Sequence, residues 1–183
     1  SGYTTQPQSV HVVELTVNSV NQPPEPEADN LTMNEGETKS FNVIANDYDP
    51  DEDTNPDEED LTVESVGFSG EDVGTPVGTI EVDGTKNVKF TPAAGYEDWN
   101  GVLTFTYTVI DMSGATAQQE CTLTINQVND APVAVANAYT ITEGQAISFN
   151  PVDNDTDIDM DEILNANPGA ESIWVTADGF SGV

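Results

Sequence analysis

The sequence predicts an all-β protein in which antiparallel Greek-key β-sandwich units follow one another end to end. Two local observations support this fold class: short runs of alternating apolar and polar residues rich in Thr, Val, Ile, Tyr and Phe, and turn-forming residues between those runs. A third observation is an internal repeat with about the length of one sandwich domain. No window of a dozen residues shows the apolar periodicity of an amphipathic helix.

Seven runs have the period-two alternation that is typical of strands. In chain order they cover residues 11–17, 40–44, 61–66, 79–82, 87–91, 103–110 and 119–125. Turns are predicted between several of these runs because Gly after Asp, Asn or Ser favours a tight reversal of the chain. The turn signals are Asp83-Gly84, residues 92–95, Asn100-Gly101 and Ser113-Gly114.

The repeat relates two stretches of the chain at a constant offset of 108 residues, which is the distance from Asn18 to Asn126. The same offset superposes apolar strand positions, a Glu-Gly pair and a row of aspartates. The matched positions are Val13 with Cys121, Leu15 with Leu123, Val17 with Ile125, Glu35-Gly36 with Glu143-Gly144, Asp49 with Asp157, Asp51 with Asp159 and Asp53 with Asp161.

The repeat gives the expected domain organisation. We expect residues 1–20 to be the last strand of a preceding repeat, residues 21–128 a complete repeat, and residues 129–183 the N-terminal half of a following repeat. Residues 129–183 should not close a sandwich alone, because the later strands are missing from them. One hypothesis is that residues 9–17 of a neighbouring chain complete this half.

The charge of the chain restricts its partners. It has 34 Asp and Glu residues against three lysines and no arginine, which gives a formal net charge of −31. Nucleic acid and anionic membrane surfaces are therefore excluded as partners, because both need clustered basic residues. The natural counter-ion for so many carboxylates is a hard cation such as Ca²⁺. The alternative is an acidic surface that only keeps the protein soluble in salt.

The aspartates are regularly spaced, which favours the cation. Asp47, Asp49, Asp51 and Asp53 occupy alternate positions, and alternate side chains of an extended segment share one face. Carboxylates so close together repel one another unless a cation lies between them. An EF-hand loop does not fit, because Glu52 stands where that loop needs Gly, and Pro56 prevents an exiting helix.

These motifs together resemble a known family. The sequence runs through Asn129-Asp130-Ala-Pro, then Glu-Gly, then an Asn-Asp-x-Asp-x-Asp row, and Gly95-Tyr-x-x-x-Asn-Gly precedes Phe-x-Tyr-x-Val-x-Asp111. The combination resembles the Ig-like or cadherin-like tandem repeats of large bacterial surface adhesins, including the extender repeats of the RTX type. The resemblance implies Ig-like/cadherin-like β-sandwich repeats arranged end to end, with Ca²⁺ at the junctions between them.

The resemblance also implies which residues bind calcium. A complete junction is expected around Val128, with an early glutamate at Glu35, a linker cluster, and an Asp-x-Asp pair at Asp155 and Asp157. A second junction, near Asn18, Asn21 and Gln22, lacks its upstream glutamate and should bind more weakly. Asp111 either adds a ligand or caps a turn. The full expected set is Glu35, Asp47, Asp49, Asp51, Asp53, Asp111, Asn126, Asn129, Asp130, Glu143, Asp155, Asp157 and Asp159.

Catalysis is not expected. The chain has one histidine, His11, on the exposed side of its run, and Cys121 takes a buried apolar position, so no nucleophile has a base. Trp99 and Trp174 would suggest carbohydrate binding only if both rings were exposed on one face. The expected function is a calcium-stabilised extender of a secreted, bacterial cell-surface adhesin that contacts neighbouring repeats of its own polypeptide.

Two alternatives stay open: a carbohydrate-binding module and a homophilic adhesion module. A glycan or protein ligand of the adhesin would bind to distal domains outside this chain. No apolar run approaches the length that crosses a membrane, so membrane insertion is not expected. The single cysteine permits no internal disulfide, which fits either a cytosolic protein or a secreted one that calcium stabilises.

Overall fold

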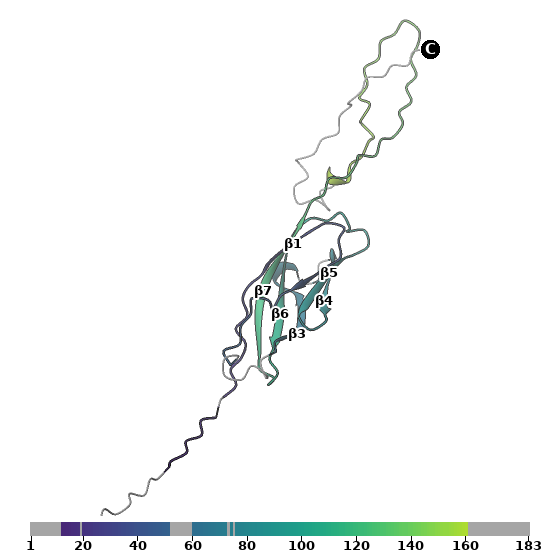
Figure 1. Cartoon of the computed structure of the whole chain (residues 1–183). Coiled ribbons are helices and arrows are strands. Elements are labelled where there is room, and N and C mark those ends of the chain that lie inside the picture. Colours follow the sequence, from purple (N-terminus) through teal and green to yellow (C-terminus); the bar gives the residue numbers. More distant parts are fainter. Residues whose placement is uncertain (1–11, 19, 52–59, 73, 75, 161–183) are drawn as a thin grey trace, which may run out of the picture.

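The computed structural model describes residues 12–18, 20–51, 60–72, 74 and 76–160, and these contain one complete β-sandwich (Figure 1). One sheet has the strand order β1-β7-β6-β3, and the second has the order β2-β5-β4. The strands are β1 (Asn30–Asn34), β2 (Lys39–Asn42), β3 (Thr62–Phe68), β4 (Gly78–Asp83), β5 (Asn87–Pro92), β6 (Gly101–Ile110) and β7 (Thr116–Asn126). Two short 3₁₀ turns lie at Gly70–Asp72 and Ile158–Met160. The predicted all-β, Ig-like sandwich is confirmed.

The core lies between the two sheets and follows from the alternation in the longest strands. In β6, Leu103, Phe105, Tyr107 and Val109 all point inward and are buried. β7 pairs antiparallel with β6 and adds a second buried row that contains Cys121, as expected. Buried apolar rows of this kind supply most of the stabilisation of a small sandwich.

The strand β1 was not predicted from the sequence. Its five residues are mostly polar, and only Met33 is fully buried, so the alternation is weak. β1 pairs in parallel with β7, with Leu31 opposite Leu123 and Met33 opposite Ile125. This contact with the apolar edge of β7, rather than local propensity, makes the segment a strand.

Two expected strands differ in the structure. The run at residues 40–44 ends as a strand at Asn42, whose side-chain Oδ1 accepts a hydrogen bond from the Ile44 amide (3.2 Å) as the chain bends. Within the run at residues 11–17, residues 12–17 form no strand and pair with no neighbour in the described part of the chain. Their alternating sequence predicts a strand, but a strand needs a partner to pair with.

The stretch from residue 129 to residue 160 forms no sheet. Its described pairing is one bridge between Val133 and Thr156, which is the counterpart of a bridge between Glu25 and Tyr48 in the complete unit. The rings of Tyr139 and Phe149 stack with their centroids 4.2 Å apart, but both stay more than two-fifths exposed. Trp174 and the remainder of the chain to residue 183 lie outside the described residues.

Candidate metal centre

Three carboxylates from different parts of the chain converge where the sandwich ends. Glu35 follows β1, Asp130 lies in the linker after β7, and Asp159 belongs to the 3₁₀ turn Ile158–Met160. One oxygen of each lies within 4.8 Å of the others. The group therefore joins the complete sandwich to the following stretch of chain, at the place where the sequence predicts a complete junction.

Glu35 is held in this group by two hydrogen bonds. The Val128 amide donates to Glu35 Oε1 (2.6 Å), and Asn100 Nδ2 donates to Glu35 Oε2 (3.2 Å). Glu35 itself is only 9% exposed. A buried carboxylate with both oxygens hydrogen-bonded has a fixed orientation, so its charge is aimed at the linker.

Asp159 is held by the linker. Its Oδ1 accepts from Gln127 Nε2 (3.1 Å), and its Oδ2 accepts from the Asp130 amide (2.8 Å). The Asp159 amide donates in turn to Asp157 Oδ1 (3.1 Å). Because Asp159 is 4% exposed, these donors bind a carboxylate that is almost removed from water.

The surroundings of Glu35 and Asp98 oppose the ionisation of these two carboxyl groups. Burial is the main cause that raises the pKa of Glu35, and the nearby charges of Asp159 and Asp98 raise it further against the two hydrogen bonds. Burial also raises the pKa of Asp98, followed by the charges of Asp130, Glu97 and Asp159. Asp98 is therefore a fourth carboxylate in the field of this group.

Asp98 was not among the predicted residues. It lies in the loop before β6, outside the regular rows of aspartates, so its spacing carries no signal. The register of the sheet explains its position: Gly101 at the start of β6 pairs with Ile125 near the end of β7. The loop that contains Asp98 and Asn100 therefore lies beside the linker. The Glu97-Asp98 pair directly before the Asn100-Gly101 turn is the signal that could have located it.

No lysine neutralises the group. Lys86 pairs with Asp60 (3.3 Å), Lys89 pairs with Glu81 (2.6 Å), and Lys39 Nζ donates to the Thr32 carbonyl (3.0 Å). These three are all the lysines of the chain, which has no arginine. The negative charge of the group is thus left for a cation from solution to balance.

A second acidic group, of three buried aspartates, lies at the start of the complete unit; unlike those of the first group, their carboxylate oxygens do not all lie within 4.8 Å of one another. Asp49, Asp51 and Asp111 are 2%, 5% and 4% exposed. The Gln22 amide donates to Asp51 Oδ2 (2.6 Å), and Asn21 Nδ2 donates to Asp111 Oδ2 (3.0 Å). Asp49 Oδ1 accepts from the Asp51 amide (2.9 Å), whereas Asp49 Oδ2 is buried with no hydrogen-bond partner. A buried carboxylate oxygen without a partner is costly unless an ion or a water binds it.

Asp111 also caps a turn, which was one of its two expected roles. Its Oδ1 accepts from the Ala115 amide (2.8 Å), and its backbone carbonyl accepts from the Gly114 amide (3.3 Å). The other oxygen of the carboxylate stays directed at Asn21. One residue thus both closes the turn between β6 and β7 and contributes to the acidic group.

The two ends of the unit share their local structure. The bond from the Gln22 amide to Asp51 has its counterpart in the bond from the Asp130 amide to Asp159. Two further pairs match at the same offset: the Asp51 and Asp159 amides bind the carboxylate two residues earlier, and the Glu27 and Val135 amides bind Asp47 and Asp155. The chain thus enters each repeat in the same conformation.

Other expected ligands lie apart from these groups. Asp47 does not share its neighbours' contacts, since both of its oxygens accept from the Tyr107 hydroxyl (2.9 and 2.8 Å). The chain bends at residues 43–46, Tyr48 forms an isolated bridge with Glu25, and a turn begins at residue 50, so the row of alternate positions is not one continuous extended segment. Asp155 accepts from the Val135 amide (2.8 Å).

The remaining expected ligands are Asn126, Asn129, Glu143 and Asp53. Asn126 accepts a hydrogen bond from the Glu35 amide through its backbone carbonyl (3.0 Å), and Asn129 Nδ2 donates to the Asp130 carbonyl (2.7 Å). The Glu143 side chain is exposed, and Asp53 lies outside the described residues.

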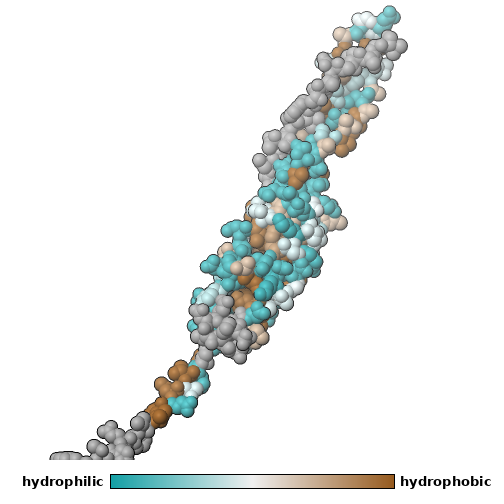
Figure 2. Space-filling model, in the orientation of Figure 1, coloured by the Kyte–Doolittle hydropathy of each residue, from teal (hydrophilic) through white to brown (hydrophobic). Residues whose placement is uncertain are grey.

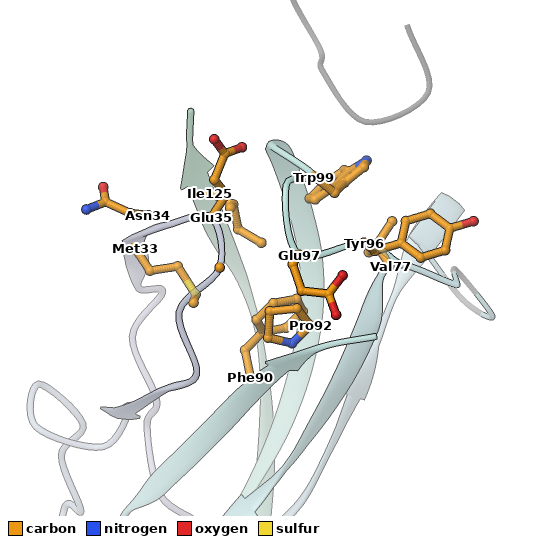
Figure 3. A pocket seen from close by; sticks show the side chains of 11 residues that line it. Met33, Asn34, Glu35, Val77, Phe90, Pro92, Tyr96, Glu97, Trp99 and Ile125 are labelled. Carbon is orange, nitrogen blue, oxygen red and sulfur yellow. The ribbon is translucent and has the colours of Figure 1, made fainter. Parts of the chain in front are cut away.

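A small apolar pocket opens beside Glu35 (Figure 3). Met33, Phe90 and Ile125 line it together with Tyr96 and Trp99. Trp99 is partly buried and packs against the core, and a Cβ added at Gly101 would lie 2.8 Å from its ring. Trp99 is therefore a packing residue, and its ring does not stand free on the surface as a sugar-stacking platform would.

Comparisons with known proteins identify a family to which the chain is similar. A family model described as "Bacterial Ig domain" matches residues 21–124 and 129–181. A search of curated proteins found no match. One similar solved structure is a nucleoside hydrolase-related hypothetical protein from Saccharophagus degradans, described as associated with carbohydrate metabolism. It has 13% identity and a TM-score of 0.38, and the alignment covers 58% of this chain and 26% of that one.

That likeness is too weak to support any argument, and this chain spans only about a quarter of that protein. None of the helices in the described part of the chain is long and apolar enough to cross a membrane. The family match, by contrast, covers most of the sequence in two segments whose boundary lies at the acidic group of Glu35, Asp130 and Asp159. The chain belongs to the bacterial Ig domain family, a non-catalytic type of repeat.

Proposed function

We propose that this chain is a calcium-stabilised structural repeat of a bacterial cell-surface adhesin, in which bound calcium stiffens the junctions between successive Ig-like units. A row of such units would hold a distal ligand-binding domain away from the cell. The observation that carries the proposal is the convergence of Glu35, Asp130 and Asp159 from two matched segments, with each lysine of the chain engaged elsewhere.

The donor set suits calcium. Ca²⁺ takes six to eight oxygen ligands in flexible geometry, from carboxylates, amide carbonyls and water. Glu35, Asp130 and Asp159 each offer a carboxylate oxygen, and Asp98 adds charge close by. No thiol or imidazole belongs to the group, which disfavours zinc and other soft metals.

The ion would act on the junction in two ways. It would neutralise carboxylates that burial and mutual repulsion now destabilise, and it would tie the linker and the next repeat to the sandwich. Because the ion binds this arrangement and not an open linker, its binding free energy stabilises the arrangement by mass action. Hinge motion at the linker would then decrease.

The acidic group at Asp49, Asp51 and Asp111 would be a weaker site of the same kind. Gln22 stands there in the place that Asp130 has at the other end, so one carboxylate is replaced by an amide. Asn21 and Gln22 already donate to two of the three carboxylates. The partnerless Asp49 Oδ2 supports a cation at this end too, and its affinity should be lower because fewer charges contribute.

The experiment is a calcium titration of the whole chain, followed by small-angle scattering and thermal unfolding in chelator and in excess calcium. We expect calcium to raise the unfolding temperature and to extend the particle. Glu35→Gln and Asp159→Asn should lower the affinity of the tighter site at least tenfold, because each removes a charged ligand.

A matched control is Glu64→Gln, which removes the same charge from an exposed position on β3. It should leave the titration unchanged. Equal unfolding temperatures and dimensions with and without calcium would contradict the proposal, and the acidic residues would then serve solubility alone.

A further inference from the structure

The outer face of the sheet β1-β7-β6-β3 carries little charge, although the net charge of the whole chain is −31. β1 and β6 contain no charged residue, β3 contains Glu64, and β7 contains Glu120. The second sheet is smaller, yet its strands contain Lys39, Glu81, Asp83 and Lys89. Figure 2 shows weakly polar and apolar residues among the hydrophilic ones on the surface of the sandwich. The acidic residues of the chain are thus concentrated outside these four strands.

Threonines form most of this outer face. They alternate along β6 and β7 with the buried residues of the core, so their side chains point away from it. The register places Thr124 between Thr32 and Val102, and Val102 is 58% exposed. Thr and Val are branched at Cβ and have few rotamers, so they lose little conformational entropy when another surface covers them. We name the following residues the threonine face: Thr32, Val102, Thr104, Thr106, Thr122 and Thr124.

The polar groups in and around the threonine face bond to one another across the strands. Thr122 Oγ1 donates to Asn30 Oδ1 (2.9 Å), which links β7 to β1. Ser65 Oγ and Gln118 Nε2 both donate to Thr108 Oγ1 (3.0 and 3.1 Å), which links β3, β6 and β7. Because these groups already have partners within the sheet, covering them would cost little hydrogen bonding to water.

The aromatic rings of these four strands belong to the core side of the sheet. Phe105 and Tyr107 of β6 are fully buried, and Phe68 of β3 packs against the core, where its ring meets Phe90 edge to face. A carbohydrate site usually offers an exposed ring on which a sugar can stack. The composition of this face therefore favours a protein surface over a sugar as its partner.

We propose that the outer face of the sheet β1-β7-β6-β3 binds the same face of a second copy of this protein. Two copies that met through the acidic ends of the unit would bring carboxylates together, whereas here uncharged side chains meet uncharged side chains. A two-fold axis makes such a contact self-complementary. The pairing goes beyond the proposed function and needs no calcium.

The size of the face suits a weak pair. Four strands about 4.8 Å apart, with about 3.3 Å per residue, give a flat area of about 500 Å². Two copies would then bury about 1,000 Å² in total, which is near the lower limit for a specific interface. A single contact should therefore be reversible, and contacts between two rows of repeats would add to one another.

Glu120 limits the strength of this pairing. It is an exposed carboxylate of β7 that lies opposite Thr106 in the register, and its Oε2 accepts from Ser69 Oγ (3.0 Å). In the pair, Glu120 would lose water against the neutral surface of the partner. Glu120→Gln should therefore tighten the association by about threefold or more. Glu81→Gln makes the same change on the second sheet and should leave the association unchanged.

Analytical ultracentrifugation of the 183-residue chain, in chelator and over a wide range of concentration, tests the pairing. The wild type should associate reversibly. Val102→Glu and Thr124→Glu should each weaken the association by more than about tenfold, because each places a carboxylate in a neutral contact. Thr79→Glu is the matched control, because it makes the same change at an exposed position on β4 in the second sheet, and it should have no effect.

Thiol labelling locates the contact on the surface. Cys121 is buried, so the thiol introduced by Thr124→Cys or by Thr79→Cys is the one that a reagent reaches first. The thiol introduced by Thr124→Cys should react more slowly as the protein concentration rises. The thiol introduced by Thr79→Cys should react at the same rate throughout.

Salt distinguishes this contact from one between opposite charges. Sodium chloride should tighten the association, because it screens the repulsion between two chains of like charge. A monomer at every concentration would overturn the proposal, and a glycan that binds this monomer but not Thr124→Glu would identify a sugar as the occupant instead. Equal effects of Thr124→Glu and Thr79→Glu would also overturn it, since the copies would then meet elsewhere.

Discussion

Single residues in this protein owe their roles to contacts that sequence spacing does not fix. The spacing of the aspartates predicted an acidic group at each end of the repeat, and Glu35, Asp130 and Asp159 do lie close together at one of them. It did not show that Asp159, rather than Asp155, faces Glu35, because the bend of the chain decides which carboxylate points to the linker. Asp98 escaped prediction because only the pairing of β6 with β7 places its loop there.

Because the pKa of Glu35 is raised, we predict that the stability of the fold depends on pH when a chelator removes calcium. A carboxyl group whose pKa is higher in the folded than in the unfolded state stabilises the fold when it is protonated. That contribution is complete below the ordinary value of 4.5 and is lost as the pH rises through the raised folded-state pKa. Chemical denaturation at several pH values should therefore show the wild type gaining stability relative to Glu35→Gln as the pH falls.

Calcium should reverse this trend, since it binds the ionised carboxylate. In saturating calcium, acidification should release the ion and destabilise the junction. A difference between wild type and Glu35→Gln that does not vary with pH in chelator would show that Glu35 is not the group responsible.

The Tyr107 hydroxyl predicts a second effect on stability. It is the donor to both oxygens of Asp47, whose pKa is raised mainly by burial. Tyr107→Phe removes the hydroxyl and leaves Asp47 with the Glu27 amide as a donor, so we expect a loss of about 1–3 kcal/mol in the free energy of unfolding. Tyr96→Phe serves as control because the Tyr96 hydroxyl points away from the pocket (Figure 3). Equal losses in the two variants would contradict this role.

Among the strands, the alternation of apolar and polar residues predicted those that bury one face. It failed for segments that are strands, or are not, because of the neighbour they pair with. The runs in β6 and β7 have strong apolar alternation and form the longest strands. β1 has little alternation, yet it is a strand because it lies against β7. Residues 12–17 have clear alternation but pair with no strand in the described chain. Local pattern alone could not separate these cases.

The backbone conformation of the loop before β6 should affect how well the acidic group binds calcium. Gly101 has φ of 151°, and a Cβ there would lie 2.8 Å from the Trp99 ring. Gly101→Ala should therefore move Trp99 and disturb the bond from Asn100 to Glu35. We expect a loss of more than about 1 kcal/mol in the free energy of unfolding, together with weaker calcium binding.

Gly67→Ala is the control for this change. Gly67 lies in a strand with no atom within 4 Å of an added Cβ, so its substitution should affect neither quantity. Unchanged calcium affinity in Gly101→Ala, measured by the same titration, would show that this loop does not position Glu35.

The whole molecule combines a net charge of −31 with three lysines that all lie in or beside the sheet β2-β5-β4. Self-repulsion of this size favours expanded states and is screened by salt. We predict that sodium chloride in chelator raises the unfolding temperature gradually, whereas calcium acts at far lower concentration. If sodium matched calcium at equal ionic strength, bulk screening and not ligation would explain the stabilisation.

The parallel pairing of β1 with β7 determines how the unit would respond to tension. The chain enters β1 at one end of the sandwich and leaves β7 at the other, and the two strands run in the same direction through five paired positions. Pulling on the two linkers therefore slides β1 along β7, and the hydrogen bonds between them carry the load together instead of opening one after another. The force needed to unfold single molecules should therefore fall when Leu31→Pro removes a donor from that ladder.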